Sequence, residues 1–234
     1  MNPRVFCSSQ RMAHVRASII SEIAGMMRRC PGTISLGQGI VSYGPPETVL
    51  DVVRGFGDQA EQHRYGSVYG QSALLEQITR KLRAENEITL GCEQSLMVTA
   101  GSNMAFLNAI LAIADPDDEI ILPLPFYFNH EMAIRMIGCR VVGVPTDSAY
   151  HLDIDALRAA ITTRTRAIVT VSPNNPTGAV YAESQLREVS RLCHEHGLFH
   201  ICDEAYEYFT WSGVRHYSLM LRTVSIRHRM SCVD

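Results

Sequence analysis

The sequence predicts an α/β protein with a mostly parallel, doubly wound sheet, in a three-layer α/β/α arrangement. Short apolar runs without polar alternation recur from Leu96 onward, and such runs are typical of parallel strands that are covered on both faces. A segment with helical periodicity follows each run. Helices that alternate with short strands in this way favour right-handed crossovers between parallel strands.

Three helices are predicted before this alternation begins. Residues 18–29 place isoleucines and methionines near one face, a second helix starts at Pro46 and runs towards Gln59, and a third covers residues 72–86. Two glycine-punctuated loops, ISLGQGIVSYGPPE and HRYGSVYGQS, lie between them. The single lysine of the chain, Lys81, falls in the third helix, where we expect it at the surface.

The remaining elements follow in strict alternation. The predicted strands are residues 96–100, 119–123, 140–144, 167–171 and 198–202, with 221–226 as a further candidate. The predicted helices are residues 102–114, 126–137 and 153–161, and a fourth lies between the last two strands of the main series. Neither an internal repeat nor a low-complexity segment interrupts this pattern.

Composition excludes several classes of protein. Hydrophobic residues make up 46% and charged residues 19% of the 234 residues, which is enough apolar material for a full core. A formal net charge of -3 without a long basic run argues against nucleic-acid binding. The start of the chain lacks the apolar core of a signal peptide, no apolar stretch reaches membrane-spanning length, and the seven scattered cysteines form no CxxC pair. We therefore expect a cytoplasmic protein that does not enter a membrane.

The first candidate ligand site is the segment VTAGSNMAF. A predicted strand runs into Gly101 and a helix begins at Ser102, so free backbone N–H groups and the positive helix end point beyond the sheet. Ser102 and Asn103 add side-chain donors, and together these groups would hold a phosphate. An ordinary N-cap serine explains Ser102 equally simply, so this signal is weak alone.

Two further strand ends carry polar groups. Asp203 directly follows an apolar strand, where a partly desolvated carboxylate pairs strongly with a protonated ring nitrogen or another cation, and Tyr206 lies three residues later. Asn175 follows the preceding strand in SPNNPTG. Each has an ordinary alternative, since Asp203 could cap a helix and Asn175 could simply belong to a turn. Their joint occurrence favours a flat, phosphorylated ligand with a pyridinium ring, because open α/β sheets bind ligands beyond these strand ends.

The motifs VTAGS, PFY, SPNNPTG and DEAY, in this order and spacing, resemble the class I/II aminotransferases, which are fold-type-I enzymes dependent on pyridoxal 5'-phosphate. The resemblance extends from about Ser18 to Tyr217. It implies a large domain that binds the cofactor and an amino-acid or 2-oxo-acid substrate. On this basis we divide the chain into residues 1–45, an N-terminal arm and substrate loop, and residues 46–234, the cofactor-binding large domain.

The resemblance also implies a role for each site residue. Asp203 would keep the pyridine nitrogen protonated, so that the ring acts as an electron sink, and Asn175 and Tyr206 would hydrogen-bond its 3'-oxygen. The other implied contacts are the phosphate at Ser102 and Asn103, ring stacking by Tyr127, the substrate carboxylate at Gly39, and the phosphate of a neighbouring subunit at Tyr65.

The sequence departs from the family pattern after DEAY. The family's lysine, which bonds to the cofactor and moves the substrate proton, has no counterpart there, and the C-terminal small domain is missing. We therefore expect an aminotransferase-type protein whose activity is impaired, with an exposed apolar face. The alternative is a non-catalytic binding or regulatory partner of a full-length relative. The expected assembly is accordingly a homodimer or a heterodimer with such a relative.

A third hypothesis concerns metal. The segment CHEHGLFHICD gathers possible ligands: Cys193, His194, His196, His200, Cys202 and Asp203. Helical spacing directs His194 and His196 to different sides, so the residues favour no metal site over the cofactor site. Substrate choice is barely readable, although the loops around Tyr43 and Tyr69 resemble those of aminotransferases that accept larger or aromatic amino acids.

Overall fold

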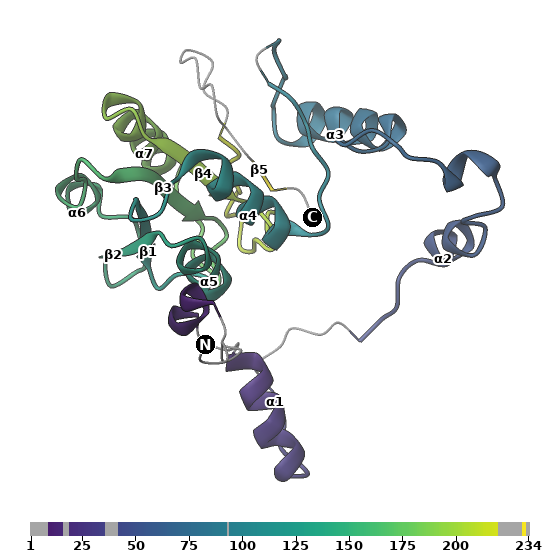
Figure 1. Ribbon diagram of the computed structural model, residues 1–234, viewed down its shortest axis with the longest axis horizontal. Helices are drawn as coiled ribbons and strands as arrows, with labels where there is room; N and C mark the ends of the chain where they lie inside the picture. Colours follow the sequence, from purple (N-terminus) through teal and green to yellow (C-terminus); the bar gives the residue numbers. More distant parts are fainter. Residues whose placement is uncertain (1–8, 16–18, 36–41, 93, 220–230, 233–234) are drawn as a thin grey trace, which may run out of the picture. The chain divides into compact units, whose positions relative to one another are not determined.

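The computed structural model describes residues 9–15, 19–35, 42–92, 94–219 and 231–232 (Figure 1). The chain divides into two compact units, one formed by residues 1–15 with 69–234 and the other by residues 16–68. The predicted division into residues 1–45 and 46–234 stays a prediction. Within the described residues, no helix is long and apolar enough to cross a membrane.

A five-stranded parallel sheet forms the centre of the larger unit, in the order β2-β1-β3-β4-β5. Its strands are β1 (Glu119–Leu124), β2 (Arg140–Pro145), β3 (Thr165–Val171), β4 (Phe199–Asp203) and β5 (Ser231–Cys232). The strand order places β1, β3 and β4 side by side, so the loops that follow them leave the sheet at one edge. These loops carry three of the predicted site segments.

Helices cover both faces of this sheet, as the sequence predicts (Figure 1). The helices of the larger unit are α3 (Ser72–Glu85), α4 (Ser102–Ile113), α5 (Phe128–Met136), α6 (Ile154–Ala159) and α7 (Glu183–Glu195), with a 3-10 helix, η1, at Gln10–His14. Helices α4 and α5 contribute to one buried apolar cluster, and α6 and α7 contribute to the other. The prediction of a three-layer α/β/α architecture is therefore confirmed.

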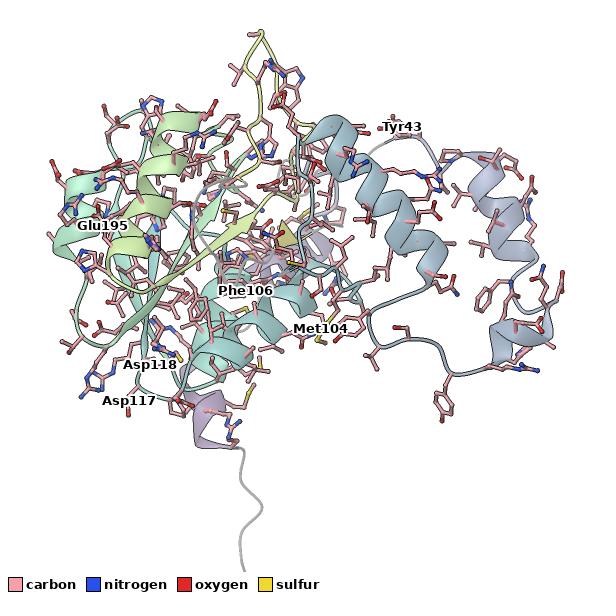
Figure 2. All side chains as sticks on the ribbon, turned by 90° about the horizontal axis from the view of Figure 1, so that it is seen from above. Tyr43, Met104, Phe106, Asp117, Asp118 and Glu195 are labelled. Carbon is pink, nitrogen blue, oxygen red and sulfur yellow. The ribbon has the colours of Figure 1, made fainter. Side chains whose placement is uncertain are left out.

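The alternation of side chains along each strand explains the two clusters. In β1, Ile120 and Leu122 belong to the cluster of α4 and α5, whereas Ile121 belongs to the cluster of α6 and α7. Both faces of the strand are buried, so the strand reads as a continuous apolar run. Figure 2 shows the same sorting on α4, where Phe106 is 1% exposed and packs inward, while Met104 is 43% exposed.

The smaller unit is described by itself. It contains α1 (Ile19–Arg29), α2 (Glu47–Arg54) and the 3-10 helix η2 (Ala60–His63), none of which has a buried residue. Ile19, Ile23 and Met26 of α1 are 58%, 41% and 48% exposed, so the apolar face of this helix is open. Gly55 ends α2 earlier than the predicted Gln59.

The structure corrects one predicted strand. Residues 96–100 form no strand. The N–H group of Val98 donates to the carbonyl of Tyr69, and the carbonyl of Thr99 accepts from the nearby N–H group of Gly101, but neither bond belongs to a strand ladder. An apolar run becomes a strand only where a neighbouring strand provides a ladder partner. The candidate strand at residues 221–226 lies outside the described residues. The two-residue strand β5, which the sequence did not predict, pairs with the end of β4.

Candidate functional site

The candidate site lies where β3 and β4 end. Val171 is the register partner of Asp203, so the SPNNPTG turn and the DEAY segment leave the sheet beside each other. The N–H group of Ser172 donates a 3.0 Å hydrogen bond to the backbone carbonyl of Asp203, which fixes the two loops together at their starting points. The predicted convergence of these two segments is thus present in the structure.

Asp203 is buried, with 4% exposure, and forms an ion pair with a histidine. Its Oδ2 atom lies 3.0 Å from Nε2 of His130, in the first turn of α5, and its Oδ1 atom accepts a 3.0 Å hydrogen bond from the N–H group of Ala205. Burial alone would raise the pKa of Asp203, but the hydrogen bond and the charge of His130, with the Ala205 bond, hold it below its ordinary value. The carboxylate is therefore stabilised in its charged form.

His130 is positioned by aromatic rings as well as by Asp203. It is 2% exposed and stacks on Phe106 of α4 with ring centroids 4.0 Å apart. The ring of Tyr127 meets its edge at a centroid distance of 5.2 Å. The Nδ1 atom of His130 is buried and has no hydrogen-bond partner among the described residues. The ring of His130 is thus positioned by Phe106, Tyr127 and Asp203, while its Nδ1 atom has no partner among the described residues.

Tyr127 stands at the start of α5 and joins the site to α4. Its hydroxyl accepts a 2.6 Å hydrogen bond from Nδ2 of Asn129, and the same amide lies 3.2 Å from Oδ1 of Asn103. Burial and the nearby hydroxyl of Tyr206 raise the pKa of Tyr127. The structure therefore brings Tyr127, Asn103 and Tyr206 into one neighbourhood with Asp203.

The helix end predicted to hold a phosphate is formed. Gly101 adopts a φ of 84°, a conformation that favours glycine, and α4 begins at the next residue, Ser102. The first turn of this helix carries Asn103, whose side chain faces Asn129. N–H groups at the start of a helix are suited to an anion, and this helix start lies next to the aromatic and amide groups of Tyr127 and Asn129.

The two asparagines of SPNNPTG have different positions. Asn174 is buried, and its Oδ1 atom accepts hydrogen bonds from the N–H group and the hydroxyl of Thr177, at 3.2 Å and 3.0 Å. Asn174 therefore makes the hydrogen bonds that shape the turn. Asn175, the predicted ligand residue, is half-buried beside it. Tyr206 is 40% exposed and packs edge-on against Phe209.

The structure does not test the predicted roles of Tyr65 and Gly39 in this site. Tyr65 belongs to the smaller unit, where its side chain is fully exposed, and Gly39 lies outside the described residues. Their roles stay predictions.

The possible metal ligands of the third hypothesis do not form a cluster among the described residues. Both ring nitrogens of His200 bond to hydroxyl groups, of Thr170 and Ser190, and Asp203 pairs with His130. The group of potential ligands with metal spacing that the described residues contain is instead Glu204, Glu207 and His216. These side chains already bond to other protein groups, as described below.

The family model for "Aminotransferase class I and II" matches residues 31–231. This range is most of the chain and includes the site residues described above beyond the ends of β3 and β4. The chain belongs to the class I and II aminotransferase family.

Individual aminotransferases show how much of the family pattern is present. "Aromatic-amino-acid aminotransferase 2" of Thermococcus litoralis is 31% identical over 213 residues, which cover 90% of this chain and 54% of that protein. The solved N-succinyldiaminopimelate aminotransferase of Mycobacterium tuberculosis superposes with a TM-score of 0.81 at 29% identity, over 90% of this chain and 55% of that one. Aspartate aminotransferase of Thermus thermophilus with maleate gives a TM-score of 0.81 at 32% identity. The chain spans about half the length of these aminotransferases.

Sequence reasoning missed His130 and misplaced Lys81. His130 lies in a helix, where a histidine carries no obvious signal, although its position three residues after Tyr127 puts both on one helical face. Lys81 was expected at the surface, but its side chain is 21% exposed and forms an ion pair with Glu207. The partner lies 126 residues away in the sequence, so no local pattern reveals this contact.

Proposed function

We propose that this chain binds pyridoxal 5'-phosphate beyond the carboxyl ends of β3 and β4 and serves amino-group transfer between an amino acid and a 2-oxo acid. The buried ion pair between His130 and Asp203 is the observation that carries the proposal. A carboxylate that is 4% exposed and held in its charged form is suited to accept a hydrogen bond from a protonated ring nitrogen.

The residues around this pair fit a flat, phosphorylated ring. Tyr127 supplies an aromatic face next to Asp203, Tyr206 supplies a phenol, and Asn175 lies in the turn that leaves the neighbouring strand. The start of α4 at Ser102 and Asn103 offers N–H groups to the phosphate. When bound, pyridoxal 5'-phosphate would supply an electron sink for the bond changes at the substrate carbon. The contribution of the chain is to hold the ring in place and to keep its nitrogen protonated through Asp203.

The chain offers one side-chain amine. Lys81 is the single lysine of the 234 residues, and its ammonium group is engaged with Glu207. A lysine ordinarily both bonds to this cofactor and moves the substrate proton. We therefore propose that the 234-residue chain holds the cofactor by noncovalent contacts alone and transfers amino groups poorly or not at all.

An absorbance titration of the purified chain with pyridoxal 5'-phosphate tests the binding site. We expect saturable binding, and we expect Asp203→Asn to raise Kd by about tenfold or more, because a charge-assisted hydrogen bond is lost. Asp117→Asn is the matched control, since Asp117 lies in the turn before β1 and its side chain is 65% exposed. Equal Kd values for the unaltered chain and for Asp203→Asn would overturn the proposed site.

Borohydride reduction followed by peptide mass spectrometry tests the noncovalent mode. We expect no stoichiometric pyridoxyl group on Lys81 after reduction of the loaded chain. Stoichiometric labelling of Lys81 would contradict the proposed mode of binding while leaving the binding site itself unchallenged.

The exposed aromatic segment after DEAY favours a second candidate function, that of a non-catalytic partner of a full-length relative. Tyr208, Phe209, Trp211 and Val214 are 69%, 52%, 71% and 50% exposed. Exposed apolar groups this close together commonly mark a contact surface. Light scattering of the chain, alone and mixed with an intact aminotransferase, tests this. A mixed dimer that is weakened by Trp211→Ser would support the partner role. If the chain stays a homodimer or a monomer when the intact aminotransferase is added, the partner role is excluded.

The compartment also belongs to the proposal. The described cysteines Cys30, Cys92, Cys139, Cys193 and Cys202 are all free thiols, which is consistent with the proposed cytoplasmic location.

A further inference from the structure

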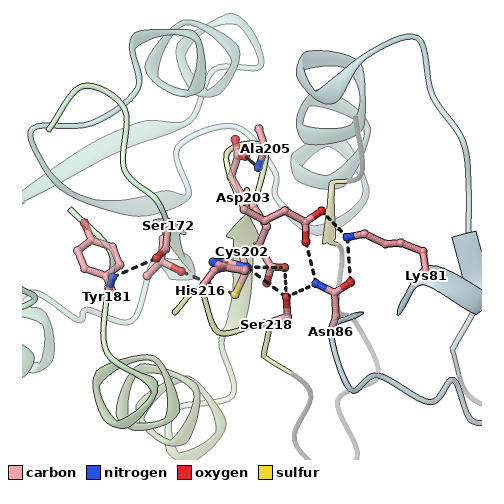
Figure 3. A network of polar contacts seen from close by, with 12 residues as sticks. Lys81, Asn86, Ser172, Tyr181, Cys202, Asp203, Ala205, His216 and Ser218 are labelled. Atoms are coloured by element: carbon pink, nitrogen blue, oxygen red, sulfur yellow. Dashed lines mark hydrogen bonds and ion pairs between the residues drawn. The ribbon is translucent and has the colours of Figure 1, made fainter. Parts of the chain in front are cut away.

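A polar network lies beside the candidate site, between α3 and the DEAY turn (Figure 3). Six side chains from three segments form it: Lys81 and Asn86 at the end of α3, Glu204 and Glu207 in the turn after β4, and His216 and Ser218 farther along the chain. None of them belongs to the proposed cofactor contacts. The network therefore needs a separate explanation.

Glu207 is held from α3. Its Oε1 atom forms an ion pair with the ammonium group of Lys81, and its Oε2 atom accepts a 2.8 Å hydrogen bond from Nδ2 of Asn86. The side chains of Lys81 and Glu207 are only 21% and 16% exposed. Lys81 also lies over the ring of Tyr208, with its nitrogen 5.4 Å from the ring centroid. This contact is much better shielded from solvent than an ordinary helix-surface ion pair.

Glu204 is held from the other side. Its Oε2 atom accepts a 2.6 Å hydrogen bond from the hydroxyl of Ser218 and lies 3.3 Å from Nε2 of His216. The side chains of His216 and Glu204 are 8% and 10% exposed. Asn86 connects the two halves, because its Nδ2 atom also donates a 2.8 Å hydrogen bond to the hydroxyl of Ser218. Both glutamates are therefore bound into one connected set of contacts.

The residues between the two glutamates are Ala205 and Tyr206. The N–H group of Glu207 donates a 3.0 Å hydrogen bond to the carbonyl of Glu204, which closes the turn around them. Within this turn, the N–H group of Ala205 donates to Oδ1 of Asp203. A shift of the turn would thus move the phenol of Tyr206 and one of the hydrogen bonds to Asp203 together.

We propose that Lys81 and Asn86 are positioning residues that fix the turn from Glu204 to Glu207, and so aim Tyr206 and Asp203 at the cofactor. The proposal rests on the proposed function for its cofactor. Lys81 does not touch the cofactor in this account. It neutralises Glu207, whose carboxylate would otherwise lie partly buried without a cation and would pull the turn towards solvent.

The neighbouring residue provides a matched control. Arg80 forms an ion pair with Glu76 on the same helix, but these side chains are 66% and 61% exposed. Both variants, Lys81→Met and Arg80→Met, replace a long cation with a long apolar chain and break one ion pair of α3. They differ in whether the broken pair anchors the DEAY turn.

The test combines hydrogen exchange of the cofactor-free chain with cofactor titration. In Lys81→Met, we expect the amide of Glu207 to exchange at least about tenfold faster and Kd for pyridoxal 5'-phosphate to rise about tenfold. We expect Arg80→Met to match the unaltered chain in both measurements, and Lys81→Arg to restore most of both. The rescue variant also guards against a simple failure of Lys81→Met to fold.

A double-mutant comparison identifies the route of the effect. If Lys81 acts through Tyr206, then Lys81→Met and Tyr206→Phe shift the absorption maximum of the bound cofactor in the same direction. The double variant should then have a Kd for pyridoxal 5'-phosphate no higher than that of whichever single variant binds it less tightly. A purely structural lysine would instead give fully additive losses of affinity and an unshifted absorption maximum.

The outcomes separate the two proposals. An unaltered chain that does not bind the cofactor overturns the proposed function, and the positioning role with it. Normal binding by the unaltered chain and by Lys81→Met, or fully additive losses in the double variant, overturns the positioning role alone.

Discussion

Two buried histidines, one on β4 and one on α5 beside the end of β4, differ in their hydrogen-bond partners. His200 lies on β4 itself, is 7% exposed, and bonds through both ring nitrogens to hydroxyls, at 2.9 Å from Thr170 and 2.7 Å from Ser190. His130 of α5 is 2% exposed, bonds to the carboxylate of Asp203 through Nε2, and has a buried Nδ1 atom without a partner among the described residues. The first set of groups, the hydroxyl network, has a partner at both ring nitrogens of its histidine, whereas the second, the carboxylate pair, leaves one ring nitrogen without a partner among the described residues.

The pleat of β4 explains why one strand contains both kinds of site. His200 and Asp203 are three positions apart, so they face opposite sides of the sheet, where Ser190 of α7 and His130 of α5 meet them. Fully satisfied polar groups stabilise a core and need no ligand. A buried carboxylate beside an unmatched ring nitrogen at a strand end is the arrangement on which the proposed ligand site rests. The two histidines thus differ in how they are bonded rather than in how deeply they are buried.

The largest effect should come from breaking the carboxylate pair. His130→Leu leaves the buried carboxylate of Asp203 without the ring N–H group that bonds to it, and we expect it to lower the free energy of unfolding by about 3 kcal/mol. Urea denaturation measures this loss. The double variant His130→Leu/Asp203→Leu should be more stable than the single variant, because no unpaired charge remains. A single variant that is as stable as the unaltered chain would remove the distinction between the carboxylate pair and the hydroxyl network.

The same pair should make stability depend on pH at the acid end. The pKa of Asp203 is lowered in the folded chain, so its charged form contributes stability above its unfolded pKa of about 3.9. This contribution is lost as the pH falls through the folded pKa. We expect the difference in unfolding free energy between the unaltered chain and Asp203→Asn to shrink as the pH falls below about pH 4. A difference that is independent of pH down to acid unfolding would contradict the lowered pKa.

The stability of the hydroxyl network around His200 should depend less on a single substitution. Ser190→Ala removes the hydroxyl that bonds to Nδ1 of His200 and leaves that buried atom without its bond, at an expected cost of about 1 to 2 kcal/mol. Thermal or urea unfolding measures the cost. Titration with pyridoxal 5'-phosphate should give the Kd of the unaltered chain, because the change lies on the opposite face of β4. A change in Kd as large as that of Asp203→Asn would show that the two faces are coupled.

The strands and the strand-end residues were the part of this molecule that the sequence could predict. Four strands, β1 to β4, were predicted from their apolar runs, and the place of Asp203 at the end of β4 was predicted because a charge follows such a run abruptly. Residues 96–100 show the limit of that reasoning, since an apolar run does not contain its ladder partner.

The side-chain partners were beyond sequence reasoning for the same reason. His130 and Lys81 lie in helices, and each is defined by a partner that is remote in the sequence, Asp203 and Glu207 respectively. Local patterns report periodicity and caps, whereas these contacts depend on how helices dock on the sheet. The smaller unit illustrates the converse, because α1 was predicted correctly from periodicity that buries none of its residues.

The smallest effect should come from removing the imidazole and both hydroxyls of the hydroxyl network together. In the triple variant Thr170→Val, Ser190→Ala and His200→Leu, these three polar groups become apolar, and the thiol of Cys202, a weak hydrogen-bonding group that contacts two of them, is left. Replacing hydrogen-bonded partners together is nearly neutral in stability, and we expect a change of less than about 1 kcal/mol in the free energy of unfolding. The triple variant should therefore be at least as stable as Ser190→Ala, which leaves His200 half-satisfied. Urea denaturation of both variants checks this order, and titration with pyridoxal 5'-phosphate should give the unaltered Kd in each. A triple variant less stable than the single one would mean that His200 contributes more than its hydrogen bonds. In that case, hydrogen bonding at both ring nitrogens would not be a sufficient account of what His200 does on its face of β4.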